Sequence, residues 1–496
     1  MTYIALEQRF KELGNLRHAQ AMLNWDEAVM MPSGGGSIRA ESMATLAAMA
    51  HRMITAAETA QFIEAAAEQD ELSPWQRANL REITTVWRDA TALPESLVIA
   101  RSRASSLCEQ AWRVARPGHD WQSVEPLLGE VVELTRQVAS CLGEAADLDP
   151  YDALLDRYET GVTQSMIDPI FAELKSFLPD FVEQVIAKQG PVQPFPQSIS
   201  ATRQGNLGRA LMAKLGFDFE RGRLDTSHHP FCGGDPDDTR ITTRYDEQEF
   251  LSSMMAVLHE TGHALYQQGL PRQWRGQPVG DSLGAAVHES QSLLMEMQVC
   301  RSRAFIEFAG PLIRQHLDEG SNDPAWDLDN LHRHSIRVAK GFIRVDADEV
   351  TYPLHVILRY ELEQALLSGD LSVADIPDAW NEKMQTYLHI DTRDNLADGC
   401  MQDVHWFAGL IGYFPTYTLG ALTAAQLFAK ARLDEPGIEG AVAEGDFAPL
   451  LSWLRRNIHA KGALLRADQL ILEVTGEPLG TDAFRAHLRS RYLGDE

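Results

Sequence analysis

The chain has 496 residues, of which 44% are hydrophobic and 23% are charged, a composition that is typical of globular proteins and excludes general disorder. Acidic residues outnumber basic residues by 71 to 44, so the formal net charge is -27. This charge argues against nucleic acid and anionic membranes as partners, because like charges repel. The five cysteines form no Cys-x-x-Cys pair, which favours a reducing, cytoplasmic location over a disulfide framework.

The first half of the chain is predicted to form long amphipathic helices. Residues 41–68 and 124–148 place apolar side chains at helical spacing. The first 20 residues mix charges among their apolar positions, so they do not resemble a secretion signal. Residues 188–200 hold three prolines and a glycine, which indicates a break between helices, either a hinge or a simple loop. We therefore expect one domain over residues 1–496, with a candidate sub-domain break near 188–200.

A short strand and a helix follow near the middle of the chain. The β-branched run at residues 239–245 predicts the clearest β element. Directly after it, Asp246 is a candidate N-cap with Glu249 three residues on, and Gly269 and Pro271 are expected to end the helix. This predicted helix contains the sequence "HETGH".

The "HETGH" sequence has the spacing of a zinc peptidase helix. His259 and His263 are four residues apart, so they face the same side of a helix and offer two of the nitrogen ligands that zinc prefers. Glu260 then points at the attacking water as a general base. The alternative is a chance match on a surface helix.

A catalytic zinc also needs a third protein ligand. A second helix is predicted from Ser282 to Phe308 and contains "VHESQ". Adjacent residues on a helix point about 100° apart, so only one of His288 and Glu289 can face the metal, and we favour Glu289. Glu296 lies on a similar face and could orient a ligand histidine, although a solvent-exposed side chain is the simpler interpretation.

The longest uncharged stretch runs from Trp406 to Ala429, which is long enough to span a bilayer. Pro415 and three glycines would interrupt a lipid-facing helix there. We therefore expect a buried, partly irregular segment that lines a cavity.

Six motifs resemble, in the same order, those of the M32 metallocarboxypeptidases, the carboxypeptidase Taq family. They are "HPF" at 229–231, "DTRIT" at 238–242, "HETGH" at 259–263, "HESQ" at 288–291, "IRVDAD" at 343–348 and "GCMQDVHW" at 399–406. The resemblance implies a mainly α-helical domain with a deep central groove, usually a homodimer. It also implies broad-specificity release of single C-terminal residues with zinc, or sometimes cobalt, and it makes Glu289 the third ligand.

An enzyme that acts at C-termini must hold a free carboxylate, and arginine offers two parallel donors for it. We choose Arg344 for this role and expect Arg240 to shape or close the groove. The alternative for each is an ion pair with a neighbouring aspartate, Asp348 or Asp238. His229 is a candidate substrate contact or simply a groove-wall histidine.

The developing oxyanion needs a donor besides the metal. His405 and Tyr413 lie in or beside the uncharged stretch and resemble the His and Tyr donors of related helical zinc peptidases. Tyr417 either contacts the substrate or packs in the core. Asp403 is expected to orient a neighbour.

Two other functions stay open on these residues. A helical zinc oligoendopeptidase would use the same His-Glu-x-x-His helix and a distant glutamate. A catalytically silent peptide-binding protein would keep the fold but not depend on Glu260.

Overall fold

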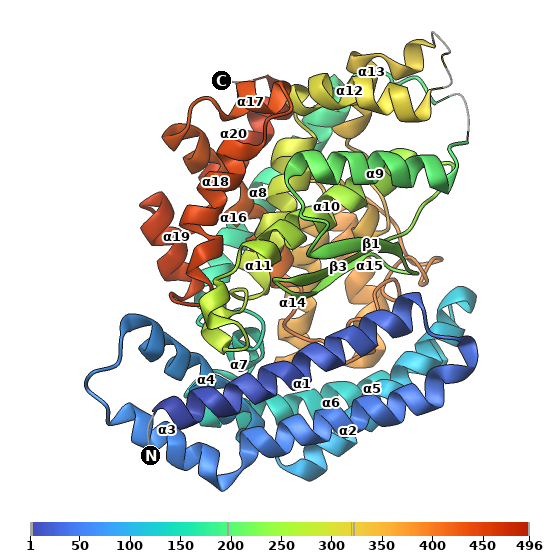
Figure 1. Ribbon diagram of the computed structural model, residues 1–496. Helices are drawn as coiled ribbons and strands as arrows, with labels where there is room; N and C mark the ends of the chain where they lie inside the picture. The colour runs from blue at the N-terminus through green and yellow to red at the C-terminus, as the bar shows by residue number, and fades with distance from the viewer. Residues whose placement is uncertain (1–2, 196–197, 319, 321–322, 495–496) are drawn as a thin grey trace. The chain divides into compact units, whose positions relative to one another are not determined.

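The computed structural model describes residues 3–195, 198–318, 320 and 323–494. Within these ranges the chain forms 20 α-helices and one three-stranded sheet (Figure 1). The prediction of a mainly α-helical fold with a small β element is confirmed. The chain divides into two compact units, made of residues 1–90, 190–336 and 423–479 in the first and 91–189, 337–422 and 480–496 in the second.

The first unit holds the sheet and most of the helices. Its elements are α1 (Tyr3–Val29), α2 (Gly36–Thr55), α3 (Ala57–Ala67), α4 (Pro74–Ala92), α9 (Ala201–Leu215), β1 (Gly222–Thr226), β2 (Phe231–Asp235), β3 (Asp238–Thr243), α10 (Phe250–Gly269), α11 (Ala285–Leu293), α12 (Arg303–Leu317), α13 (Leu328–Ser335), α17 (Ile438–Ala443), α18 (Ala448–Asn457) and α19 (Ala467–Thr475). The last two residues of α4 belong to the second unit.

The second unit is built from helices and irregular segments. Its helices are α5 (Glu95–Ala115), α6 (Trp121–Ala146), α7 (Pro150–Asp156), α8 (Gln164–Lys188), α14 (Tyr352–Ser368), α15 (Ile376–Leu388) and α20 (Asp482–Leu488), and α16 (Pro415–Asp434) crosses the unit boundary. The end of α8 and the start of α9 confirm the predicted break between helices at 188–200, and a unit boundary falls after Gln189.

The small sheet has the strand order β1-β3-β2, with β1 parallel and β2 antiparallel to β3. Strand β3 corresponds to the predicted strand. Strands β1 and β2 were not predicted, because "GRLDT" and "FCGGD" contain few of the β-branched and aromatic residues that favour strands. Both α10 and α1 pack near β2, so the sheet lies beside the motif helix.

The motif helix α10 begins at Phe250, four residues after the predicted N-cap, and ends at Gly269 as expected. The predicted start was wrong because Asp246 forms a turn of its own. Its carboxylate accepts the Gln248 N–H at 2.8 Å, and its backbone N–H donates to Ser253 Oγ at 2.9 Å. Aspartate commonly makes such local bonds, and they compete with helix initiation.

The region from Ser282 to Phe308, predicted as one helix, forms three separate elements. α11 starts at Ala285, a π-helical turn η5 (Leu294–Cys300) follows, and α12 starts at Arg303. Ser302 caps α12 by accepting the Phe305 N–H at 3.1 Å. The apolar pattern continues across these junctions, so periodicity alone did not reveal them.

The uncharged stretch is irregular and largely buried up to the start of α16, as expected. Trp406, Phe407, Ile411 and Phe414 are all at most 3% exposed. Across the part of the chain that is described, no helix is long and apolar enough to cross a membrane.

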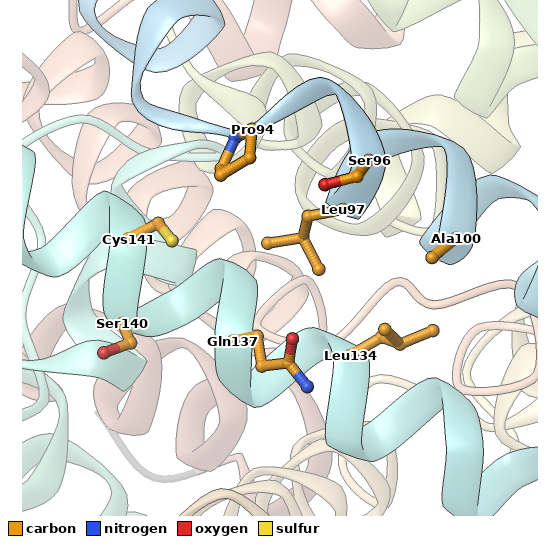
Figure 2. A pocket seen from close by; sticks show the side chains of 8 residues that line it. All are labelled: Pro94, Ser96, Leu97, Ala100, Leu134, Gln137, Ser140 and Cys141. Carbon is orange, nitrogen blue, oxygen red and sulfur yellow. The ribbon is translucent and has the colours of Figure 1, made fainter.

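Helices α5 and α6 pack along each other in the second unit, and α6 confirms the amphipathic helix predicted over 124–148. Near the start of α5 a groove of about 530 Å³ opens between them (Figure 2). Leu97 and Ala100 line it from α5, and Leu134, Gln137 and Cys141 line it from α6.

Candidate active site

Helices α10 and α11 approach each other at Gly262, inside the "HETGH" motif. A Cβ atom at this position would lie 2.4 Å from the Gln291 carbonyl oxygen and 2.6 Å from Ser292 Cα. No side chain fits there, so only glycine lets the two backbones touch. The contact lies next to His263 on α10 and close to Glu289 on α11, which brings the two helices together at the predicted metal ligands.

The three residues predicted as metal ligands lie together in the first unit. One candidate ligand atom from each of His259, His263 and Glu289 lies within 4.8 Å of the others. Glu289 Oε2 is 3.2 Å from His263 Nε2 and 3.8 Å from His259 Nε2. Among the described residues this is the only group of His, Cys, Asp and Glu side chains with such spacing.

His288 occupies a different position from its neighbour Glu289. Its ring stacks on His263 with centroids 4.4 Å apart, and its carbonyl oxygen lies 3.0 Å from His263 Nδ1. A carbonyl only accepts hydrogen bonds, so His263 carries its proton on Nδ1 and leaves Nε2 available as a ligand. Burial and the nearby His263 lower the pKa of His288 to about 3, so its ring is neutral.

Glu296 is buried against the site, so its interpretation as a solvent-exposed side chain was wrong. It is 8% exposed, and its Oε2 atom lies 2.9 Å from His259 Nδ1. Its other oxygen accepts Arg301 Nη2 at 2.6 Å. The carboxylate therefore accepts a hydrogen bond from the Nδ1–H group of His259. This bond directs Nε2 toward Glu289, as an orienting partner does in metal sites. The π-helical turn η5 carries Glu296, and such turns are frequent at functional sites.

The carboxylates of Glu289 and Glu296 near His259 favour a positive charge at this site. Burial lowers the pKa of His259, but Glu289 and Glu296 outweigh it and raise the pKa to about 10. Burial raises the pKa of Glu289, but His259 and His263 outweigh it and bring the pKa to about 2. A divalent metal would satisfy the same charge requirement, and two imidazoles with one carboxylate are a donor set that suits zinc. The residues therefore fit the implied metal.

Glu260 lies beside the ligand group but is not part of it. Its side chain is 7% exposed, and its Oε2 atom is buried with no hydrogen-bond partner among the described residues. Burial raises the pKa of Glu260 above its ordinary value. An unpartnered buried carboxylate oxygen is costly to maintain, and it is well suited to accept a proton from a reacting molecule.

Arg344 is buried in the second unit and pairs with Asp403. Its Nη2 atom is 2.9 Å from Asp403 Oδ1, and its Nη1 atom donates to Tyr352 Oη at 3.0 Å. The neighbouring Asp348, considered as an ion-pair partner, instead accepts backbone N–H groups of Ala339, Val350 and Thr351.

A second arginine shares the same carboxylate. Arg359 Nε donates to Asp403 Oδ2 at 2.8 Å, and Arg359 is fully buried. Burial raises the pKa of Asp403, but Arg359 and Arg344 outweigh it and hold the pKa well below its ordinary value. Asp403 thus orients two neighbours, in line with the expectation for it. Arg359 was not predicted, although a lone arginine within the apolar run "LHVILRY" was a usable signal.

His405, Tyr413 and Tyr417 form one aromatic cluster in the second unit. His405 Nε2 lies 3.3 Å from Tyr417 Oη, and the Tyr413 and Tyr417 ring centroids are 5.3 Å apart. The guanidinium of Arg344 lies 4.7 Å from the Tyr417 centroid. Burial lowers the pKa of His405 to about 4, so this ring is neutral near pH 7.

The two remaining predicted residues lie in the sheet of the first unit and in a connection between its strands. Arg240 on β3 makes a bidentate pair with Asp238 at 2.6 and 3.0 Å, and its guanidinium lies 4.4 Å from the Trp25 ring centroid. This is the ion pair that was considered as its alternative. His229 is exposed in the connection between β1 and β2.

Comparisons with known proteins agree with this geometry. The family model of the carboxypeptidase Taq (M32) metallopeptidases matches residues 5–492. Thermostable carboxypeptidase 1 of Thermus thermophilus is 39% identical over 496 aligned positions, which cover 97% of this chain and 96% of that protein. Carboxypeptidase 1 of Bacillus subtilis is 34% identical, with 97% and 96% covered.

Several solved structures are also similar to this chain in fold and in sequence. Metallocarboxypeptidase 1 of Trypanosoma cruzi has a TM-score of 0.96 and 39% identity, with 99% of each chain covered. The M32 carboxypeptidase of Deinococcus radiodurans has a TM-score of 0.94 and 34% identity, with 99% of this chain and 98% of that one covered. The chain therefore belongs to the M32, or carboxypeptidase Taq, family of metallopeptidases.

Proposed function

We propose that this carboxypeptidase uses a zinc ion held by His259, His263 and Glu289 to release single C-terminal residues from peptides with broad specificity. The observation that carries the proposal is the buried group of these three side chains beside Glu260. When bound, zinc supplies a Lewis acid that polarises the scissile carbonyl and the attacking water. Cobalt(II) accepts the same ligands and is expected to substitute.

Glu260 acts as the general base in this proposal. Its unpartnered Oε2 atom accepts a proton from the attacking water and later returns one to the leaving amine. Burial raises its pKa above the ordinary value, which makes the carboxylate a stronger base. The Glu296 carboxylate and the His288 carbonyl keep the two ligand histidines in the tautomers that leave Nε2 available.

The Arg344 guanidinium captures the C-terminal carboxylate of the substrate. Two buried guanidinium groups, from Arg344 and Arg359, share the single carboxylate of Asp403, and the neighbouring His405 is neutral. The cluster therefore carries an excess positive charge that favours binding of an anionic group such as a carboxylate. His405 and Tyr413 donate to the oxyanion or the peptide backbone, while Tyr417, Arg240 and His229 contact or shape the bound peptide.

The whole chain acts as one peptidase domain that works in the cytoplasm as a homodimer. Its partners are peptides with a free C-terminus rather than nucleic acid or membranes, in line with the net charge of -27.

A matched peptide panel tests the direction of cleavage. Each peptide is supplied as the free acid and as the C-terminal amide, and products are identified by mass spectrometry. A carboxypeptidase that binds the terminal carboxylate cleaves the acids and spares the amides. Equal cleavage of both forms at internal bonds would support the oligoendopeptidase instead.

A further inference from the structure

We propose that one face of α5 is a positioning surface for residues 397–412, the segment that carries the "GCMQDVHW" motif. The proposal rests on the function above, in which His405 of this segment assists catalysis. Arg101, Trp112 and Arg116 are the positioning residues. None of them belongs to the six family motifs.

Three side chains of this face donate to backbone carbonyls of the segment. Arg101 Nη2 donates to Gly409 O at 2.9 Å, Trp112 Nε1 to Met401 O at 2.8 Å, and Arg116 Nε to Ala397 O at 3.0 Å. The three donors advance along the chain while their acceptors step backward, so the segment runs antiparallel to the helix. All six residues belong to the second unit.

The spacing of these residues explains how one helix face can make all three bonds. Arg101, Ser105, Cys108, Trp112 and Arg116 follow one another by three or four residues, which places them in one row along α5 and the turn η2 (Arg116–Gly118) that continues it. Cys108, at the centre of the row, is fully buried.

The segment follows α5 closely at Phe407 and Gly409. Gly409 has a φ of +77°, and a Cβ there would lie 2.7 Å from Ser105 Oγ, so glycine is required. Two residues before Gly409, the Phe407 ring stacks on Trp112 with centroids 5.7 Å apart. The carbonyls held by Trp112 and Arg101 belong to Met401 and Gly409, which bracket His405 by four residues on each side.

The motif segment depends on such bonds because it has no regular secondary structure of its own. Backbone groups outside helices and strands need other partners when they are buried. Gln402 and Glu363 provide some of them: Gln402 Nε2 donates to Asp398 O at 2.6 Å, and Glu363 accepts the Gly412 N–H at 3.0 Å. The α5 donors supply partners for the carbonyls on both sides of His405.

Arg101 is the most informative of the three donors to change. It follows Ala100, which lines the groove between α5 and α6 (Figure 2). Packing of α5 against α6 is therefore incomplete next to Arg101. We therefore expect a change at Arg101 to disturb the contact between α5 and α6 little, so that its effect reports on the hydrogen bond to Gly409.

The test compares full-length wild-type protein with Arg101→Met and Trp112→Phe. Trp112→Phe keeps an aromatic ring for Phe407 but removes the N–H donor. Arg101→Lys is the conservative rescue, because a single donor suffices for one carbonyl. Arg113→Gln is the control, since Arg113 is on the exposed side of α5 and pairs only with Glu109 among the described side chains.

Two readouts are needed. Turnover of a free-acid peptide with zinc gives kcat and KM, and hydrogen–deuterium exchange of the metal-free protein reports the mobility of residues 397–412. We expect Arg101→Met and Trp112→Phe to lower kcat by roughly 10- to 100-fold with KM changed by less than about twofold. We also expect faster exchange in 397–412 but not in α10. Arg101→Lys should recover part of kcat, and Arg113→Gln should match wild type.

The proposal is overturned if folded Arg101→Met and Trp112→Phe proteins keep the wild-type kcat and the wild-type exchange of 397–412. A wild-type protein that releases no C-terminal residue would instead refute the proposed function. In that case the exchange comparison still decides whether α5 positions the segment. Should Arg101→Met fail to fold, Trp112→Phe gives the decision alone, because it removes only a donor and part of a ring.

Discussion

The contact between α10 and α11 at Gly262 makes a sharp prediction for Gly262→Ala. The new methyl group would lie 2.4 Å from the Gln291 carbonyl oxygen, and ordinary contact begins near 3.4 Å. The two backbones must therefore separate by about 1 Å. Backbone atoms cannot rotate away as a side chain can, so the strain falls on the packing of the helices. Such overpacking costs about 1–3 kcal/mol.

Separation of the α10 and α11 backbones would also move the metal ligands apart. Glu289 Oε2 is 3.2 Å from His263 Nε2 across this contact, and metal sites hold their ligand distances to about 0.2 Å. We therefore expect Gly262→Ala to lower the zinc affinity at least about tenfold and to lower the melting temperature of the metal-free protein by a few degrees. Competition with a chromophoric chelator gives the affinity, and calorimetry gives the melting temperature.

Gly129→Ala is the matched control for this experiment. Gly129 lies within α6, and a Cβ there meets nothing within 4 Å. Alanine is a better helix former than glycine by about 1 kcal/mol, so the control should be slightly stabilised with unchanged zinc affinity. A Gly262→Ala protein with wild-type zinc affinity and melting temperature would show that the contact between α10 and α11 does not position the metal ligands.

Three further predictions follow from the buried carboxylates. Glu260→Gln should keep zinc but lose roughly 10²- to 10⁴-fold in kcat, and a smaller loss in a metal-loaded sample would remove Glu260 as the base. Glu296→Gln should weaken zinc binding by about 10- to 100-fold, measured by chelator competition; an unchanged affinity would contradict its orienting role. Burial raises the pKa of Glu363 to about 7, above the unfolded value of about 4.3. The protonated carboxyl therefore stabilises the folded protein below about pH 4, and this contribution is lost as the pH rises to 7. Relative to Glu363→Gln, wild type should lose up to about 1.4 kcal/mol per pH unit between pH 5 and 7, and parallel denaturation curves at all pH values would contradict this.

The parts of the site that depend on one helix were predictable from local spacing. His259, Glu260 and His263 lie within five residues, so their relative geometry follows from the helix itself. The third ligand was harder to predict, because helix geometry left a choice between His288 and Glu289. The stacking of His288 on His263, which distinguishes the two, requires the close approach of two helices at Gly262.

Longer-range partners were not predictable from local patterns. The partner of Arg344 is Asp403, 59 residues away, whereas the nearby Asp348 is used by local backbone N–H groups. Glu296 is buried through a π-helical turn that the apolar pattern does not reveal. Strands β1 and β2 depend on pairing with β3 more than on their own residues.

The most direct test of the account is a time course on one peptide with a free C-terminus, followed by mass spectrometry. Metal-stripped, zinc-restored and cobalt-restored samples of the same protein are compared. We expect a ladder of products, each shorter by one C-terminal residue, in the two restored samples and no products in the stripped one. Products cut at internal bonds, or a ladder that persists without metal, would contradict it.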